Sequence, residues 1–190
     1  MNIAGIVCEY NPFHSGHLHQ LAETRRALGA DTLTVCVMSG DFVQRGEAAM
    51  FSKFARAEAA CRAGADLVLE LPLPWCLSSA EGFAMGAVSL LAAVGCTQLS
   101  FGSESGDAET LLATARTLLS PELVPLLKQE LAGGASFPAA RQRALERAFK
   151  QGLLKGIERL CAHMVQLRKA DSHTLIHVDI EVHQGKRSLS

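Results

Sequence analysis

The sequence predicts an α/β fold in which an open parallel sheet carries helices on both faces. Short apolar runs alternate with longer segments of helical periodicity, and the connections between them are short. Glycine or proline closes most of these segments, as expected at the ends of strands and helices. With 48% hydrophobic and 19% charged residues, the 190-residue chain can bury a core of ordinary size, which excludes a disordered protein.

The elements follow one another in alternating order. Apolar runs predict four strands, at residues 2–8, 32–38, 66–71 and 97–101. Helical spacing of apolar residues predicts helices at residues 16–28, 52–63, 79–94, 107–119, 121–131 and 138–149. Gly29 and Gly64 fit helix C-termini, and Ser52 fits an N-cap. Near the end of the chain, alternating apolar residues predict an edge strand, through Ile176, Val178, Ile180 and Val182.

Charge divides the chain into an acidic part and a basic part. Residues 1–135 hold 8 Lys and Arg against 14 Asp and Glu, a net charge of −6, whereas residues 136–190 hold 10 against 5, a net charge of +5. The sign changes at the glycine-containing segment 132–135, where we expect a linker. We therefore predict a first domain over residues 1–135 and a basic, mostly helical C-terminal region over residues 136–190, which can contact an anionic partner.

Cysteine usage and hydropathy bear on where the protein works. The six cysteines form no C-x-x-C pair, and no basic-then-apolar leader precedes them. We read them as reduced thiols, most of them buried as small apolar residues. The longest apolar stretches are too short and too polar-flanked to cross a membrane. We therefore expect a cytoplasmic protein with no membrane partner.

The loop after the first predicted strand contains the motif His14-Ser15-Gly16-His17. In open parallel sheets ligands bind beyond the carboxyl ends of the strands, and here a helix begins at that point. Two imidazoles three residues apart can donate to phosphate oxygens and stabilise the charge that develops when an α-phosphate is attacked. Gly16 allows close backbone approach. The alternatives are capping or surface histidines, or a metal site; since His17 and His19 diverge on a helix, we predict no metal ligands.

Other candidate groups lie in the later loops. Arg45 can clamp a phosphate or a carboxylate while Lys53 adds charge, and a solvated turn with local salt bridges is the alternative. Glu70 is expected to pair with an arginine of this kind. Glu104 either contacts ribose hydroxyls or phosphate-bound Mg²⁺, or is an ordinary loop carboxylate. Trp75 either stacks on a base or packs beneath a helix.

The basic region contains a possible nucleic-acid surface. Arg143, Arg147 and Lys150 fall on one face of a predicted helix, at spacings of four and three. Such a face can contact RNA phosphates, or it can be an ordinary solvated helix face.

Longer motifs resemble a known family. H-x-G-H after a first strand resembles the HIGH signature of the nucleotidylyltransferase superfamily. The string E-Y-N-P-F-H-S-G-H at residues 9–17 more narrowly resembles the bacterial tRNA(Met) cytidine acetate ligase family. Three further segments match that family in order: S-G-D-F-V-Q-R-G-E-A at 39–48, E-L-P at 70–72 and S-F-G-S-E at 100–104. The resemblance covers residues 1–149.

The resemblance implies a Rossmann-like sheet of the HIGH-type nucleotidylyltransferase fold and an ATP-binding role for the first domain. Such a ligase activates acetate with ATP, expected as its Mg²⁺ complex, to acetyl-adenylate. It then acetylates N4 of the wobble cytidine of elongator tRNA(Met), without acetyl-CoA. The catalytic candidates are His14, His17, Arg45 and Lys53. The implied ATP-binding residues are Val7, Cys8, Glu9, Tyr10, Asn11, Pro12, Phe13, His14, Ser15, Gly16, His17, Leu18, His19, Gln20, Gly102, Glu104 and Arg168.

The C-terminal region departs from that family. An N-N-I-L-G-I-E-Y-L-like segment keeps G-I-E at residues 156–158 but loses the asparagine, and residues 167–173 match a K-R-x-G-A-x-Y-H segment only at Arg168 and a few neighbours. We therefore expect a C-terminal region that is truncated or diverged, and tRNA binding through its basic residues. Two other functions stay open. One is a nucleotidylyltransferase that acts on a phosphorylated small molecule, although this sequence has no C-terminal S-x-S-R-like motif of the kind that such enzymes often carry. The other is a nucleotide- or RNA-binding module without turnover.

Overall fold

The structure is a computed structural model that describes residues 2–103, 108–150 and 174–179. These residues form two compact units. The first contains the described residues up to Gly102 together with those from Leu175, and the second contains those from Ser103 to Thr174. Each unit is described here by itself. The division at residue 135 between an ATP-binding domain and a basic region stays a prediction.

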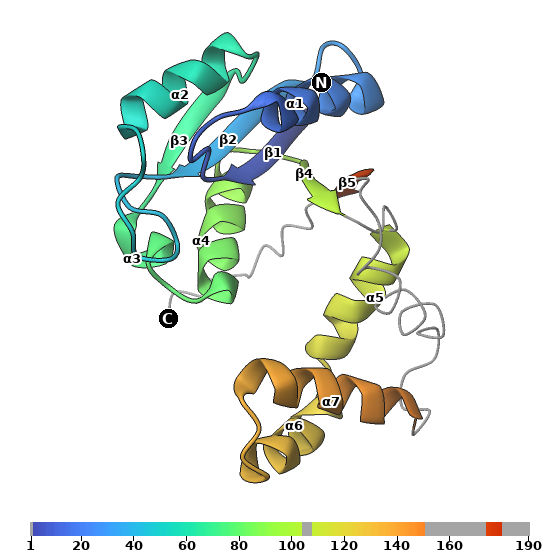
Figure 1. The fold of residues 1–190 in the computed structure, drawn as a ribbon. Helices are drawn as coiled ribbons and strands as arrows, with labels where there is room; N and C mark the ends of the chain where they lie inside the picture. Colours follow the sequence, from blue (N-terminus) through green and yellow to red (C-terminus); the bar gives the residue numbers. More distant parts are fainter. Residues whose placement is uncertain (1, 104–107, 151–173, 180–190) are drawn as a thin grey trace, which may run out of the picture. The chain divides into compact units, whose positions relative to one another are not determined.

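The first unit is built on a sheet whose strand order is β3-β2-β1-β4-β5 (Figure 1). β1 (Ile3–Cys8) pairs in parallel with β2 (Leu33–Ser39) and with β4 (Gln98–Ser103), and β2 pairs in parallel with β3 (Leu67–Leu71). The parallel α/β fold is therefore confirmed. β5 (Thr174–Asp179) lies at the sheet edge beside β4, as the alternation near the chain end predicts.

Apolar residues cover both faces of the sheet. On one face, Ile6, Cys36 and Met38 pack against α1 (Ser15–Leu28) and α2 (Lys53–Arg62). On the other, Val35 and Val37 pack against α3 (Leu73–Cys76) and α4 (Ala80–Ala93). The strand residues alternate between the two clusters because successive side chains of a strand point to opposite faces. The sheet is thus buried on both sides, with its loops left to form a site.

The ends of the helices follow the predicted capping chemistry. Gly29 ends α1 with φ 108°, a backbone conformation that favours glycine, and its N–H donates to the carbonyl of Arg25. The Ser52 hydroxyl caps α2 by accepting the N–H of Ala55. Residues 73–76 form the single turn of α3, a helix that the sequence pattern did not predict. Proline is tolerated in a first helical turn, where the N–H needs no intrahelical partner.

The described residues of the second unit form three helices, α5 (Ala108–Leu118), α6 (Leu123–Ala132) and α7 (Phe137–Lys150). α6 and α7 pack through Leu123 and Leu126 on one side and Ala144 and Ala148 on the other. The glycine segment 132–135, expected to be a linker, is the turn between these two packed helices, and Gly134 takes φ 83° there. No helix in the described part of the chain is long and apolar enough to span a membrane.

Three of the six cysteines follow the predicted burial. Cys36, Cys76 and Cys96 are buried, Cys8 is half-buried and Cys61 is exposed. Cys161 lies outside the described residues.

Candidate active site

The loop after β1 is anchored by Tyr10, whose side chain is 1% exposed. Its backbone has φ 46°, which is uncommon for a residue with a Cβ. The ring contacts Phe13 edge-on at 4.9 Å and His17 at 4.7 Å between centroids, while its hydroxyl lies 3.4 Å from the Cys36 sulfur on β2. Burial raises the pKa of Tyr10, so the phenol stays neutral at physiological pH. Tyr10 therefore forms a fixed floor beneath the histidine motif.

The two histidines of the motif cap α1 reciprocally. The Gly16 N–H donates to Nδ1 of His14 at 3.1 Å, and the His14 N–H donates to Nδ1 of His17 at 3.2 Å. The rings stack with 3.7 Å between their centroids. A Cβ at Gly16 would lie 2.9 Å from Cε1 of His14, so glycine is needed for this close approach. The predicted capping alternative is thus realised in the structure, by an unusual pair of residues.

This capping fixes where each imidazole carries its proton. Because both Nδ1 atoms accept backbone N–H groups, the proton of each neutral ring lies on Nε2. Burial, together with the neighbouring His14, lowers the pKa of His17 to about 4, so His17 is neutral at pH 7. The Ser15 N–H, in the first turn of a 14-residue helix, has no hydrogen-bond partner among the described residues. Donors at the positive end of α1 are therefore available to an anion.

The loop after β2 is tied to the loop after β1 by hydrogen bonds. The Glu9 carboxylate accepts the Gln44 N–H at 2.7 Å, and the Asn11 side-chain oxygen accepts the Met50 N–H at 2.6 Å. Within the second loop, Gly46 (φ 82°) closes a turn by donating to the Val43 carbonyl. Glu9 and Asn11, which belong to the stretch that resembles the family's ATP-binding loop, therefore have backbone hydrogen-bond partners in this structure.

Arg45 lies in that turn, between Gln44 and Gly46. It is exposed, and no ion pair or hydrogen bond engages its side chain among the described residues. A free guanidinium in a strand-end loop can still contact an anion, and its role as a phosphate or carboxylate clamp stays a prediction.

Lys53 has two acidic neighbours. Its ammonium donates to both oxygens of Glu70, at 2.9 and 2.8 Å, and lies 3.6 Å from a carboxylate oxygen of Asp41. The hydrogen bond to Glu70 raises the pKa of Lys53, which keeps the ammonium charged. The expected arginine partner of Glu70 was wrong, because this lysine takes its place. A Cβ at Gly40 would lie 2.2 Å from Oε1 of Glu70, so the small residue makes room for the pair.

Arg56 is a site residue that the sequence reasoning missed. Its side chain is 2% exposed, and its guanidinium donates to the carbonyls of Phe51, Glu9 and Gly40, the first at 3.1 Å. Glu9 follows β1 and Gly40 follows β2, so one side chain holds both strand-end loops together. The only sequence signal was an arginine inside an otherwise apolar helical face, in A-R-A-E-A-A. Solvated arginines look the same in such a pattern.

The β4 side of the site is more open. A Cβ at Gly102 would meet no atom of the described residues within 4 Å, and Gly102 is exposed. Gln20 on α1 donates to the Ser100 carbonyl at 3.2 Å, and Thr24 lies 2.7 Å from the Ser100 hydroxyl, which fixes α1 against β4. The remaining nucleotide candidates, Glu104 and Arg168, lie outside the described residues.

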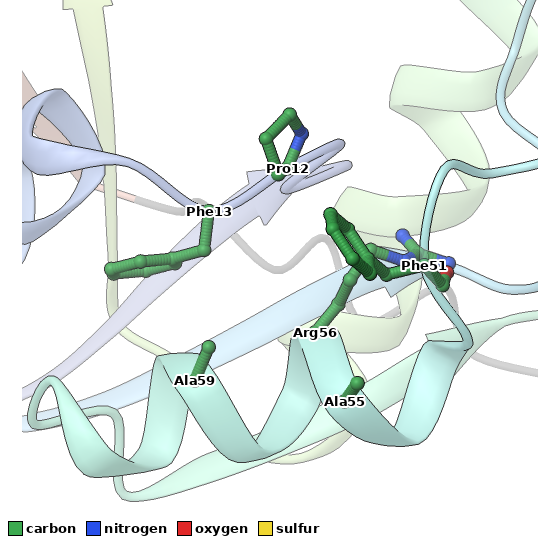
Figure 2. A pocket seen from close by; sticks show the side chains of 6 residues that line it. All are labelled: Pro12, Phe13, Phe51, Ala55, Arg56 and Ala59. Carbon is green, nitrogen blue, oxygen red and sulfur yellow. Dashed lines mark hydrogen bonds between the residues drawn. The ribbon is translucent and has the colours of Figure 1, made fainter.

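An apolar pocket of about 220 Å³ lies between the loop after β1 and α2 (Figure 2). Its lining residues are Pro12, Phe13, Phe51, Ala55, Arg56 and Ala59. Phe13 is the link to the histidine motif, since its ring lies 5.5 Å from that of His17 between centroids. Phe13 also packs against the core cluster of the α1–α2 face.

The remaining predicted groups lie elsewhere. Trp75 is 40% exposed, yet it covers Gly86 of α4, where a Cβ would lie 2.5 Å from its ring, so packing beside a helix is the interpretation that holds. In the second unit, Arg147 donates to Glu130 at 2.8 Å and to Gln129 at 2.9 Å, and Arg143 lies 3.9 Å from Glu130. The predicted basic face is therefore partly neutralised by α6. Among residues 2–103, 108–150 and 174–179, no cluster of three or more metal-ligating side chains occurs.

Comparison with known proteins gives consistent matches. The family described as HIGH Nucleotidyl Transferase matches residues 1–174. The tRNA(Met) cytidine acetate ligase of Acetivibrio thermocellus is 51% identical over 150 residues, which are 77% of this chain and 36% of that protein. The same-named protein of Alkaliphilus metalliredigens is 46% identical over 178 residues, 92% of this chain and 42% of that protein. The resemblance predicted from the motifs is thereby confirmed.

Solved structures extend the match to the fold. A crystal structure of Thermotoga maritima TmcAL bound with alpha-thio ATP has a TM-score of 0.72 and 48% identity, and covers 80% of this chain. The chain spans 37% of that protein, and between 35% and 42% of the curated relatives that it matches.

Proposed function

Because the chain belongs to the HIGH nucleotidyl transferase family, we propose that it binds ATP at the loop after β1 and activates acetate as acetyl-adenylate. The relatives named tRNA(Met) cytidine acetate ligase and the TmcAL structure with alpha-thio ATP support this proposal. The observation that carries it is the reciprocal capping of His14 and His17, which leaves two Nε2–H donors and the Ser15 N–H at one helix end. The expected place of this reaction is the cytoplasm.

In the first step a carboxylate oxygen of acetate attacks the α-phosphorus of ATP. The bond between that phosphorus and the oxygen bridging to the β-phosphate breaks, and pyrophosphate leaves with the electron pair. No protein nucleophile is required, so positioning and charge stabilisation supply the catalysis. His14 and His17 donate Nε2–H to phosphate oxygens as negative charge builds on them. A neutral His17 suits this role, because its Nδ1 can accept the His14 N–H while its Nε2–H donates to a phosphate oxygen.

Magnesium is expected to enter with ATP, since Mg²⁺ usually binds through substrate phosphates plus one or two carboxylates. It would neutralise part of the triphosphate charge. The chain's own residues would bind and orient the nucleotide. Gly102, with open space above it, leaves room for the adenosine against β4.

In the second step the N4 amino group of a cytidine in tRNA attacks the carbonyl carbon of acetyl-adenylate. A new C–N bond forms, AMP leaves with the electron pair of the broken C–O bond, and the amine loses a proton to solvent. We propose the wobble cytidine of elongator tRNA(Met) as the acceptor, in line with the names of the relatives. The basic region after residue 135 is proposed to contact the tRNA phosphates.

The test is pyrophosphate release from the purified chain with ATP and Mg²⁺, with and without acetate. Acetate-dependent release is the expected result, and it should disappear in His17→Ala. The matched control is Arg26→Ala, an exposed residue at the other end of the same helix. The His17 change removes one capping contact, worth about 0.5–2 kcal/mol, so the fold should survive. Release that is independent of acetate but depends on a phosphorylated acceptor would instead identify a nucleotidylyltransferase.

A further inference from the structure

The apolar pocket beside the histidine motif is lined in part by Phe51, Ala55 and Ala59, which the adenylation step described above does not use. Pro12 and Phe13 of the loop form one wall, and Ala55 and Ala59 of α2 form the opposite wall, with Phe51 between them (Figure 2). Its wall is shared with the site, because Phe13 contacts His17. A molecule in this pocket would therefore lie next to the group that is proposed to hold the phosphates of the nucleotide.

The size and lining of the pocket indicate what it can hold. At the ~30 Å³ that each water occupies in the liquid, about 220 Å³ corresponds to about seven waters. Acetate has only four heavy atoms and would leave most of this space empty, whereas a pyrimidine base has eight. Two phenylalanines in one pocket also suit a planar base, since flipped bases are commonly stacked against aromatic and apolar side chains.

The pocket is accessible to a base that belongs to a polynucleotide. Phe51 is 54% exposed, and Pro12 and Ala55 are exposed as well, so the opening faces solvent. An exposed aromatic residue at the rim of a pocket is typical of a binding site rather than of a core.

Arg56 adds a polar group to this apolar lining. Its side chain is 2% exposed, and its guanidinium donates to the backbone carbonyls of Phe51, Glu9 and Gly40. Arg56 therefore fixes the pocket wall between the two strand-end loops.

We propose that this pocket receives the acceptor cytosine, stacked against Phe13 and Phe51, and that it thereby places N4 beside the acetyl-adenylate. This inference rests on the proposed function, since it names where the second substrate of the same reaction binds. It assigns Phe51 to acceptor binding and not to ATP binding.

The first test is photocrosslinking of the full chain to a short RNA hairpin that carries 5-iodocytidine in its loop, because iodopyrimidines crosslink to aromatic rings on which they stack. Mass spectrometry should locate the crosslink at Phe13 or Phe51. Phe51→Ala should reduce hairpin affinity about 5- to 150-fold, the range for loss of one base–aromatic stack. Phe54→Ala is the matched control, since Phe54, three residues further along and within α2, is 76% exposed and does not line the pocket.

Three results would overturn the inference: a crosslink elsewhere, equal effects of the Phe51 and Phe54 variants, or displacement of the hairpin from the pocket by ATP alone. The second test separates this inference from the proposed function. Phe51→Ala should keep acetate-dependent pyrophosphate release while losing hairpin binding. If the unaltered chain shows no such release, the proposed function fails, and the crosslink still decides what the pocket holds. If Phe51→Ala loses release to the same extent as binding, the pocket belongs to adenylation and the inference is wrong.

Discussion

Replacement of Arg56 by lysine should destabilise the first unit strongly, although the charge is kept. The guanidinium donates to three backbone carbonyls that come from separate segments, Phe51 before α2, Glu9 after β1 and Gly40 after β2. An ammonium is a single compact donor group and reaches at most one of these carbonyls well. Two charge-assisted hydrogen bonds are then lost, at about 1.5–3 kcal/mol each, for a total of about 3–6 kcal/mol.

That loss is large compared with the free energy of unfolding of a typical protein, which is about 5–15 kcal/mol. Urea unfolding followed by fluorescence measures it well, because Trp75 is the one tryptophan of the sequence and packs on α4 within the first unit. Arg62→Lys is the control, since Arg62 lies on the same helix, 79% exposed, in an i,i+4 pair with Glu58. Its expected effect is below about 0.5 kcal/mol. If Arg56→Lys also costs less than about 1 kcal/mol, the three carbonyl contacts do not hold the loops together.

One titration and three substitutions test other parts of the reasoning. An NMR titration should place the pKa of His17 near 4. Because this pKa lies below the usual ~6.5, the contribution of neutral His17 to the free energy of unfolding is complete above pH ~6.5 and is lost as the pH falls toward 4. A measured pKa above 6 would contradict the argument that burial keeps His17 neutral. His14→Asn keeps a good N-cap but removes the Nε2–H, so pyrophosphate release should fall at unchanged stability, within about 0.5 kcal/mol; a loss of both would make His14 purely structural. Gly102→Val meets no protein atom at its Cβ, so the unfolding free energy should change by less than about 0.5 kcal/mol while ATP affinity falls at least about tenfold by calorimetry; unchanged affinity would place the adenosine elsewhere. Glu130→Ala frees Arg147 and should strengthen RNA-hairpin binding in anisotropy titrations at low salt; unchanged binding would exclude this helix face as the RNA contact.

The fold could be predicted because its signals are local. Each signal acts within a few residues of the sequence, as apolar runs of strand length do. Gly29 and Gly64, with φ near 108° and 112°, lie at the helix ends where the pattern predicts them, and Ser52 is the predicted N-cap. The missed turn of α3 has a local cause too, since two prolines there suggest a loop when in fact one of them occupies the first turn.

The site was predictable in its position but not in its contacts. The histidine motif falls at the end of β1 and the start of α1, as expected from the strand–helix order. The partners of Lys53 and Arg56 depend on segments far apart in the sequence, with separations of 17 residues to Glu70 and 47 to Glu9. Such pairings follow from the strand order and packing of the whole sheet, which a pattern of residue types along one helix does not contain.

The structural and functional interpretations of the histidine motif do not exclude each other. Capping requires an acceptor atom facing the helix, and phosphate stabilisation requires a donor facing the ligand. Imidazole alone among uncharged side chains offers both on opposite sides of one rigid ring, so a backbone N–H on Nδ1 fixes the donor on Nε2. Serine or asparagine would cap the helix equally well but would not carry a donor so far from the backbone. The tight packing of His17 on Tyr10 then keeps the ring neutral and oriented before any nucleotide arrives, which removes the reorganisation that a mobile side chain would require.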